Sequence, residues 1–164
     1  MKIAAQVSAF QLRVRRSSIE GWGVFAGVFI PRGSKVIAYA GEKITRAEAA
    51  RRARKSLRKT KELRTYFASI ARKRVQGGRK WVLDGSVGGN GSERINHSCD
   101  PNLYVRKAQG KIYFYSLRGI RKGEELSFDY AFAEERIRIP CRCRSEKCRG
   151  FMNRRLVEAA RQES

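Results

Sequence analysis

Residues 96–102 read NHSCDPN, a polar and turn-rich stretch that contains His97, the only histidine of the chain. A lone histidine more often satisfies a buried hydrogen bond than it performs catalysis. Here its neighbours are asparagine, serine and aspartate side chains, which hold polar ligands through directional hydrogen bonds. The stretch is therefore the first candidate for a binding site.

Short alternations of apolar and polar residues, separated by glycine or proline turns, flank this stretch and predict β-strands. The expected strands are residues 10–15, 24–29, 35–39, 66–70, 80–83, 103–106 and 111–116. One segment differs, because Thr45 has the properties of a helix N-cap and Glu48 follows three residues later. The sequence therefore predicts a mostly β fold with one inserted helix over residues 46–64.

That helix is strongly basic, with nine Lys or Arg residues against Glu48 and Glu62. The whole chain of 164 residues carries 37 Lys and Arg against 15 Asp and Glu, a formal net charge of +22. The positive electrostatic field of such a chain attracts polyanions. Nucleic acid contact through residues 46–64 is one interpretation; an anionic membrane surface, an acidic protein or a merely solvated helix face fits the same charge. No apolar run approaches 18 residues, so no membrane span is expected.

The cysteines are unevenly spaced. Three of the four lie within eight residues, where metal ligation is expected in preference to disulfide bridging. Cysteines that bind metal in preference to forming disulfides indicate a reducing intracellular compartment, such as cytoplasm, nucleoid or nucleus. The four cysteines are Cys99, Cys141, Cys143 and Cys148.

Two glycine-rich stretches lack the spacing of nucleotide-binding loops. Residues 21–27 read GWGVFAG, whose third glycine is one residue too far along for GxGxxG. Residues 84–91 lack the Gly-Lys-Ser/Thr ending of a P-loop. The first stretch is therefore not a Rossmann site, and the second is expected to be a flexible turn.

Four motifs, in this order, resemble the SET-domain family of protein lysine methyltransferases. They are GWGVF at 21–25 with IPRG at 30–33, YAGE at 39–42, NHSCDPN at 96–102, and GEELSFDY at 123–130. The resemblance covers residues 10–152. It implies small antiparallel sheets around a knot-like core, with the segment of Tyr130 threaded beneath the segment of His97.

The resemblance also implies roles for individual residues. Tyr130 would be the catalytic tyrosine, and Tyr39 and Phe128 would line the lysine channel with it. The four cysteines would bind one structural zinc ion through the family's post-SET motif. The residues that would contact the cofactor, S-adenosylmethionine, are Gly21, Trp22, Gly23, Tyr66, Asn96, His97 and Phe151.

The implied domain organisation has three parts. A SET domain would span residues 10–133, with the basic helix as its variable insert, and a post-SET zinc-binding segment would span residues 134–153. Residues 154–164 would form a C-terminal helical tail. The sequence does not define the oligomeric state.

The implied function is methyl transfer to the side-chain amine of lysine in a protein substrate. A histone-like or nucleic-acid-associated protein and an acidic target all stay open as substrates. Phe128 occupies the position that resembles the family's product-specificity switch, so di- or trimethylation is expected. Two alternatives remain open at this stage. The chain could be a non-catalytic basic module that binds nucleic acid or a chromatin-like protein, or a zinc scaffold used for assembly.

Overall fold

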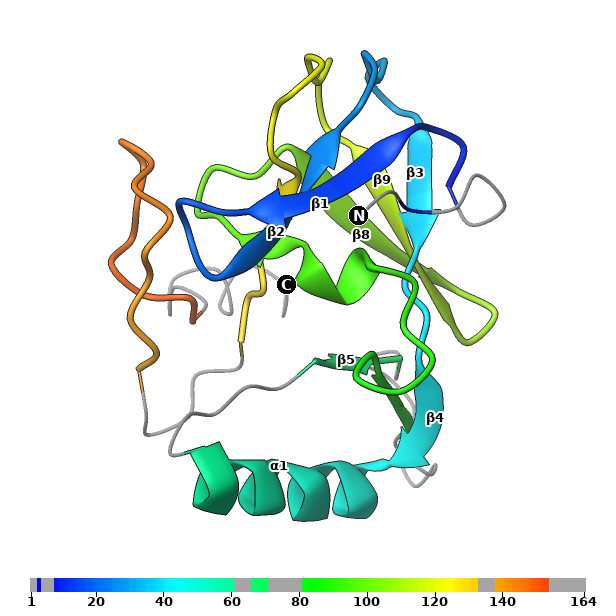
Figure 1. Cartoon of the computed structure of the whole chain (residues 1–164), viewed down its shortest axis with the longest axis vertical. Helices are drawn as coiled ribbons and strands as arrows, with labels where there is room; N and C mark the ends of the chain where they lie inside the picture. The colour runs from blue at the N-terminus through cyan, green and yellow to red at the C-terminus, as the bar shows by residue number, and fades with distance from the viewer. Residues whose placement is uncertain (1–2, 4–7, 61–65, 71–80, 133–137, 154–164) are drawn as a thin grey trace, which may run out of the picture.

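The computed structural model describes residues 3, 8–60, 66–70, 81–132 and 138–153. Its strands form three small sheets, and the one α-helix of the described part lies at one end of the molecule (Figure 1). The prediction of a mostly β fold with one inserted helix is therefore confirmed.

The first sheet is a hairpin of β1 (Leu12–Arg16) and β2 (Trp22–Ala26), paired antiparallel. Alternate side chains of both strands point into the core, where Leu12, Val14 and Val24 are almost fully buried. The second strand had been predicted to run to residue 29, but it ends at Ala26. The Gly27 amide donates one more cross-strand hydrogen bond, to the carbonyl of Gln11.

The second sheet brings together the motifs at residues 96–102 and 123–130. Its strands, in spatial order, are β3 (Lys35–Ala38), β9 (Lys111–Ser116), β8 (Leu103–Ala108), β10 (Ser127–Phe128) and β7 (Asn96–His97). The first three strands pair antiparallel, whereas β10 runs parallel to both β8 and β7. Phe128 lies opposite His97 in this ladder, so segments about 30 positions apart in the chain lie side by side.

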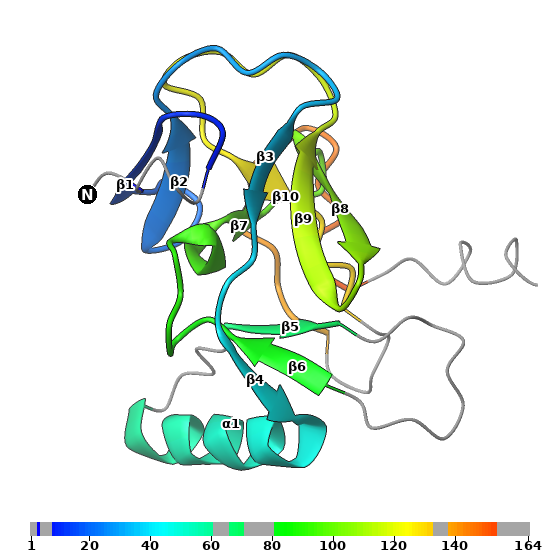
Figure 2. The same ribbon diagram turned by 90° about the vertical axis from the view of Figure 1, so that its right-hand side faces the viewer.

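The third sheet supports the helix. It consists of β4 (Glu42–Thr45), β6 (Trp81–Asp84) and β5 (Phe67–Ser69), and α1 (Arg46–Thr60) lies beneath it (Figure 2). Thr45 caps the helix, because its Oγ1 accepts a hydrogen bond from the Glu48 amide at 3.2 Å. Ala49 packs with Ile44 and Val82 in a small apolar cluster.

The predicted strand bounds agree best with the observed ones where apolar and polar residues alternate over the longest stretch. β9 has the predicted bounds, and β8 extends two residues beyond them. β4, β7 and β10 had not been predicted; the last two contain two residues each, and long-range pairing alone defines them. A 3-10 turn, η1 (Ser92–Arg94), precedes β7. Residues 61–64 of the predicted helix, residue 80, residues 134–137 and the predicted tail at 154–164 lie outside the described residues.

Candidate active site and metal centre

A cluster of aromatic rings surrounds the end of β10. The rings of Phe128 and Tyr130 have centroids 4.8 Å apart, and Phe128 packs edge-on against Phe114 at 4.9 Å. Tyr39 lies 6.4 Å from Phe114, and Phe132 lies 5.3 Å from Tyr130. The structure thus brings together the three predicted channel residues, Tyr39, Phe128 and Tyr130. It adds Phe114 and Phe132, which sequence reasoning had not distinguished from ordinary core residues.

The two tyrosine hydroxyls of this cluster both donate to backbone carbonyls. Tyr130 Oη donates to the carbonyl of Ile95 at 2.9 Å, and Tyr39 Oη donates to the carbonyl of Tyr66. Burial raises the pKa of both hydroxyls well above the usual tyrosine range. Both side chains are therefore neutral phenols near neutral pH. Their oxygen lone pairs remain able to accept a hydrogen bond from a ligand.

His97 is almost fully buried, and both of its ring nitrogens have partners. Nδ1 accepts a hydrogen bond from the Tyr130 amide at 3.1 Å, so the ring proton belongs on Nε2, which lies 3.3 Å from Cys99 Sγ. Burial lowers the pKa of His97; the nearby Asp129 carboxylate opposes this effect and the charge of Arg149 adds to it. His97 is thus a neutral bridge between β10 and Cys99.

A half-buried ion pair joins the end of β10 to the C-terminal segment. Arg149 Nη1 and Nη2 donate to the two carboxylate oxygens of Asp129 at 2.6 and 2.8 Å. Burial raises the pKa of Asp129, but the hydrogen bonds from Arg149 outweigh it and hold that pKa below its usual value. The sequence offered no signal for this pair, because Arg149 is one of 37 basic residues.

The loop between β1 and β2 is held by Asn96. Its amide nitrogen donates to the backbone carbonyls of Glu20 and Trp22, each at 3.2 Å, and to Glu125 Oε1 at 2.8 Å. Gly21 has φ +44, a conformation that favours glycine, and a Cβ on Gly23 would lie 2.1 Å from Glu125 Oε1, so the Glu125 side chain would have to move. The Asn96 side chain therefore positions the end of the β1–β2 loop and the start of β2, where Gly21, Trp22 and Gly23 lie.

The remaining predicted cofactor contacts lie near these elements. Trp22 is 45% exposed, and the guanidinium of Arg16 lies 4.7 Å from its ring centroid. Phe151 forms a bridge with Pro140, and Arg138 lies over its ring at 5.3 Å. Tyr66 contributes its carbonyl to the Tyr39 hydroxyl. The roles of these residues in cofactor binding stay predictions.

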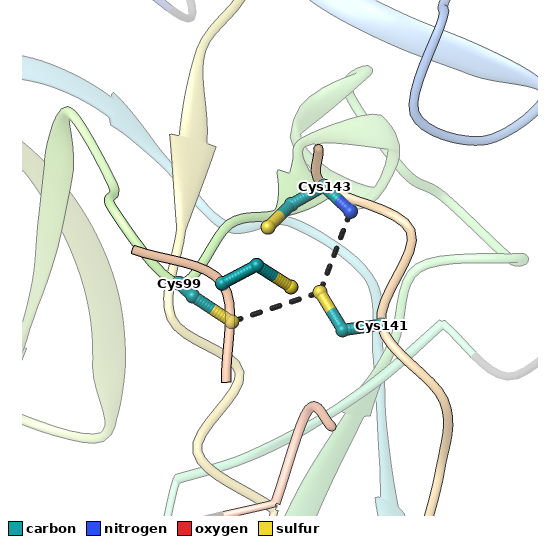
Figure 3. A group of neighbouring side chains, drawn as sticks. Cys99, Cys141 and Cys143 are labelled. Atoms are coloured by element: carbon teal, nitrogen blue, oxygen red, sulfur yellow. Dashed lines mark hydrogen bonds between the residues drawn. The ribbon is translucent and has the colours of Figure 1, made fainter. Parts of the chain in front are cut away.

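The four cysteine sulfurs lie within 4.8 Å of one another, and none forms a disulfide. Cys99 Sγ lies 3.6 Å from Cys141 Sγ, and the labelled side chains point their sulfurs toward one another (Figure 3). Zn–S bonds of about 2.3 Å in a tetrahedron would place the sulfurs about 3.8 Å apart. The cluster therefore has the donors and the spacing for a tetrahedral metal ion.

The surroundings of the cluster favour the thiolate form at Cys143, whereas burial raises the pKa of the Cys99 and Cys141 thiols. Burial raises the pKa of Cys143. Hydrogen bonds from the backbone around Cys99 and Ser145 and from the Cys141 and Cys148 thiols outweigh it and lower that pKa to about 6. The amides of Cys143 and Gly150 point at the sulfurs of Cys141 and Cys148, each at 3.4 Å. At least one sulfur of the group is thus able to ionise near neutral pH, as metal binding requires.

The family model described as "SET domain" matches residues 21–131, which include every motif described above except the cysteine segment. The chain belongs to the SET-domain family. Similar proteins include the histone-lysine N-methyltransferase, H3 lysine-4 specific, of Emericella nidulans, with 37% identity over 149 residues. Human histone-lysine N-methyltransferase SETD1B is 35% identical over 147 residues. Both matches cover 87% of this chain, but it spans only 12% and 7% of their respective lengths.

A solved SET structure supports the assignment of the fold. The crystal structure of the methyltransferase domain of human histone-lysine N-methyltransferase SETMAR superposes with a TM-score of 0.73 at 29% identity. The match covers 87% of this chain and 58% of that one. Among the described residues, no helix has the length and apolar character needed to cross a membrane.

Proposed function

We propose that the chain transfers methyl groups from S-adenosylmethionine to the side-chain amine of lysine in a protein substrate. The observation that carries this proposal is the aromatic cluster at the end of β10, in which the Ile95 carbonyl fixes the Tyr130 hydroxyl. The similar proteins named above are histone-lysine methyltransferases, which supports the same reaction.

Such a site must favour the neutral amine. A lysine has a pKa of about 10.4, so deprotonation at pH 7 costs about 3.4 pH units at about 1.36 kcal/mol each, or about 4.6 kcal/mol. The rings of Tyr39, Phe128 and Tyr130 would enclose the side chain and remove water from the ammonium, which lowers its pKa. The proton would leave through water.

The aromatic cluster also suits the cofactor, because aromatic faces and carbonyl oxygens accommodate a cationic group. When bound, S-adenosylmethionine supplies an electrophilic methyl group and a sulfonium charge that further disfavours a protonated amine. The proposed cofactor contacts are residues 21–23, at the start of β2 where Asn96 bonds the backbone, and the backbone of Asn96 and His97. Tyr66 and Phe151 complete them.

Tyr130 is the proposed orienting group. Its hydroxyl hydrogen is committed to the Ile95 carbonyl, so its oxygen accepts a hydrogen bond from the amine and directs the nitrogen lone pair. The raised pKa keeps Tyr130 protonated, so it acts by position and not as a base. In-line transfer requires the reacting atoms to be held about 3 to 3.5 Å apart, and no covalent intermediate with the protein is needed.

The product of this reaction would be di- or trimethyllysine. Phe128 lies between Phe114 and Tyr130, and its ring presents no hydroxyl to the channel. A methylated amine therefore meets no additional polar anchor at that position and has space to turn for a further transfer.

Zinc is the proposed occupant of the cysteine cluster, which fits the post-SET assignment of residues 134–153 beside a SET domain at 10–133. A bound ion would fasten the described part of the C-terminal segment to Cys99 at the end of β7. Free thiols at this site suit a reducing intracellular compartment.

The substrate would be a protein with an accessible lysine, and the names of the relatives point to histones. A chain with a net charge of +22 repels a free basic tail. A lysine on a protein already bound to nucleic acid, or on an acidic partner, is therefore the better substrate class.

A second function, contact with nucleic acid through α1, is favoured by the outward face of that helix. Two arginines of the predicted basic surface form ion pairs within the protein. Arg51 pairs with Glu48. Arg52 pairs with Glu42, Glu48 and Asp84. The exposed cations of α1 for which no ion pair is found among the described residues are Arg46, Arg54, Lys55 and Arg58.

The direct test has two steps. Calorimetry with S-adenosylmethionine measures cofactor binding, and transfer of label from the cofactor into a lysate, followed by mass spectrometry, identifies the methylated protein and residue. Binding together with lysine methylation supports the enzyme. Absence of cofactor binding contradicts it and favours a non-catalytic basic module.

A further inference from the structure

The outer face of β3, β9 and β8 carries rows of aromatic and basic side chains. Tyr104 lies directly opposite Tyr115, and Tyr115 lies directly opposite Lys35 on the next strand. Directly paired residues project from the same face of a sheet. The two tyrosine rings are stacked, with centroids 5.5 Å apart and planes 26° apart. Tyr104 remains 41% exposed, so the stacked pair presents a ring to solvent in a fixed orientation.

A second row lies beside the first. Tyr113 is opposite Arg106, and the ammonium of Lys35 lies over the Tyr113 ring, 4.1 Å from its centroid. Lys111, opposite Ala108, extends the same face toward the hairpin turn. The alternate residues Ile112 and Phe114 point into the core. Tyrosines and cations are therefore segregated on the outer side of this part of the sheet.

All charged residues of these three strands are basic. The three strands contain lysine and arginine but no aspartate or glutamate. A cross-strand tyrosine pair adds to sheet stability by itself, but it does not require cations around it. For Lys35, Arg106 and Lys111, no ion pair is found within the part of the chain that the structure describes. These cations, beside the Tyr104–Tyr115 stack and the Tyr113 ring, complement a flexible polyanion that carries planar groups.

We infer that the outer face of β3–β9–β8 binds single-stranded nucleic acid. Unpaired bases stack on aromatic rings, and the adjacent phosphates are neutralised by Lys and Arg. A duplex keeps its bases inside the helix and offers these rings nothing to stack on, and an acidic peptide has no comparable planar groups. The two ribbon views place the β8–β9 hairpin apart from α1 (Figures 1 and 2), so this surface is separate from the basic helix.

Nucleic-acid binding at this face is independent of methyl transfer. None of the residues of this face belongs to the aromatic cluster or the cysteine cluster described above. A ligand held here would place a nucleic-acid-bound protein near the enzyme, although binding itself is the property to be tested.

The test is fluorescence anisotropy of the full chain with labelled oligouridine and oligothymidine of about 16 nucleotides, a duplex of equal length and a polyglutamate peptide. The RNA and DNA arms distinguish the two sources of single strands. Tyr104→Thr removes the ring but keeps a strand-forming residue, and Tyr104→Phe removes only the hydroxyl. Arg106→Gln removes one cation, and the double variant Arg54→Gln, Arg58→Gln tests α1.

We expect wild type to bind at least one of the single strands more tightly than duplex or peptide. Tyr104→Phe should retain this affinity, and Tyr104→Thr should lose at least about fivefold. Arg106→Gln should reduce the slope of log affinity against log salt by about 0.7. Each variant should keep the thermal midpoint and cofactor binding of wild type.

Four results would overturn the inference. They are no binding of either single strand, equal or tighter binding of duplex or peptide, single-strand binding unaffected by Tyr104→Thr, and single-strand binding lost only in the α1 variant. The last would assign the contact to the basic helix instead.

Discussion

The backbone amide of Tyr130 donates a hydrogen bond to Nδ1 of His97 over 3.1 Å. The other ring nitrogen of His97 lies 3.3 Å from Cys99 Sγ. A neutral imidazole suits this place because one nitrogen accepts while the other donates. The side chain thereby connects the segment that carries the proposed catalytic hydroxyl with the proposed metal site.

Two substitutions should separate the two contacts of His97. His97→Asn keeps an acceptor near the Nδ1 position but loses the donor toward Cys99, so zinc affinity should fall by about 10- to 100-fold. His97→Gln keeps a donor near the Nε2 position but loses the acceptor for the Tyr130 amide, so kcat should fall and zinc should be retained. Chelator competition measures the first property, and methyl transfer at saturating zinc measures the second.

The contrast between the two variants is the decisive readout. A residue that only fills space would impair metal binding and kcat to the same extent in both variants. That result would contradict a bridging role for His97, even if wild type proved to be a zinc-containing methyltransferase.

The cysteine cluster predicts one zinc ion per chain. Cys148→Ser removes one of four thiolates and should reduce bound zinc well below one equivalent, with loss of thermal stability because metal binding contributes folding energy. Elemental analysis of purified protein measures the ratio. Ser145→Ala, beside the cluster, should retain the metal. Wild type with far less than one zinc per chain and a melting temperature indifferent to chelator would refute the assignment.

Much of this site was accessible from the sequence. Cys141, Cys143 and Cys148 lie close together in the chain, and the motif resemblance added Cys99, which the structure places with them. The strand at 111–116 was predicted with its observed bounds, because six residues of alternation determine which side chains face the core.

Other features could not be predicted, for physical reasons. β7 and β10 contain two residues each and exist through pairing with partners about 30 positions away, so no local pattern marks them. Phe114 alternates like any core residue, and only packing reveals it beside Phe128. Arg149, the partner of Asp129, could not be told apart in the sequence from the other arginines. The prediction that Asn96 contacts the cofactor stays a prediction; the hydrogen bonds from its side chain to the carbonyls of Glu20 and Trp22 had not been predicted.

Removing Arg149 should destabilise the fold in a pH-dependent way. Arg149 holds the pKa of Asp129 below its usual value, so this stability is present above the unfolded pKa of about 3.9 and is lost as pH falls through the folded pKa. Arg149→Gln should therefore lower the free energy of unfolding by about 1–2 kcal/mol at pH 7, with a smaller difference at pH 3. Urea denaturation at both pH values measures this.

The matched control is Arg142→Gln, because Arg142 is 75% exposed in its pair with Glu20. Screening by solvent makes such a pair weak, so this variant should differ little from wild type at either pH. Equal destabilisation by both substitutions would show that the Asp129–Arg149 pair has no special role.

Tyr130→Phe should abolish most methyl transfer while the fold and cofactor binding persist. The substitution removes only the hydroxyl that would orient the amine, and it frees the Ile95 carbonyl, at a stability cost of about 1 kcal/mol. Loss of orientation should reduce kcat on the order of 100-fold. Single-turnover transfer and calorimetry with the cofactor give the two measurements. Near wild-type activity in this variant would exclude Tyr130 as the orienting residue.

Phe128→Tyr should shift the product toward monomethyllysine. The Phe128 ring lies 4.8 Å from Tyr130 and 4.9 Å from Phe114, so a hydroxyl added to it would enter the proposed channel beside the orienting tyrosine. That hydroxyl would hold a water molecule or bond the amine, leaving a methylated nitrogen too little room to turn and react again. The first transfer should remain active, because Tyr130 is unchanged. Mass spectra over long reaction times should show dimethyl or trimethyl product for wild type and mainly monomethyl product for the variant. If wild type yields monomethyl product alone, or if both proteins give the same distribution, Phe128 is a core residue and the product state is determined elsewhere in the channel.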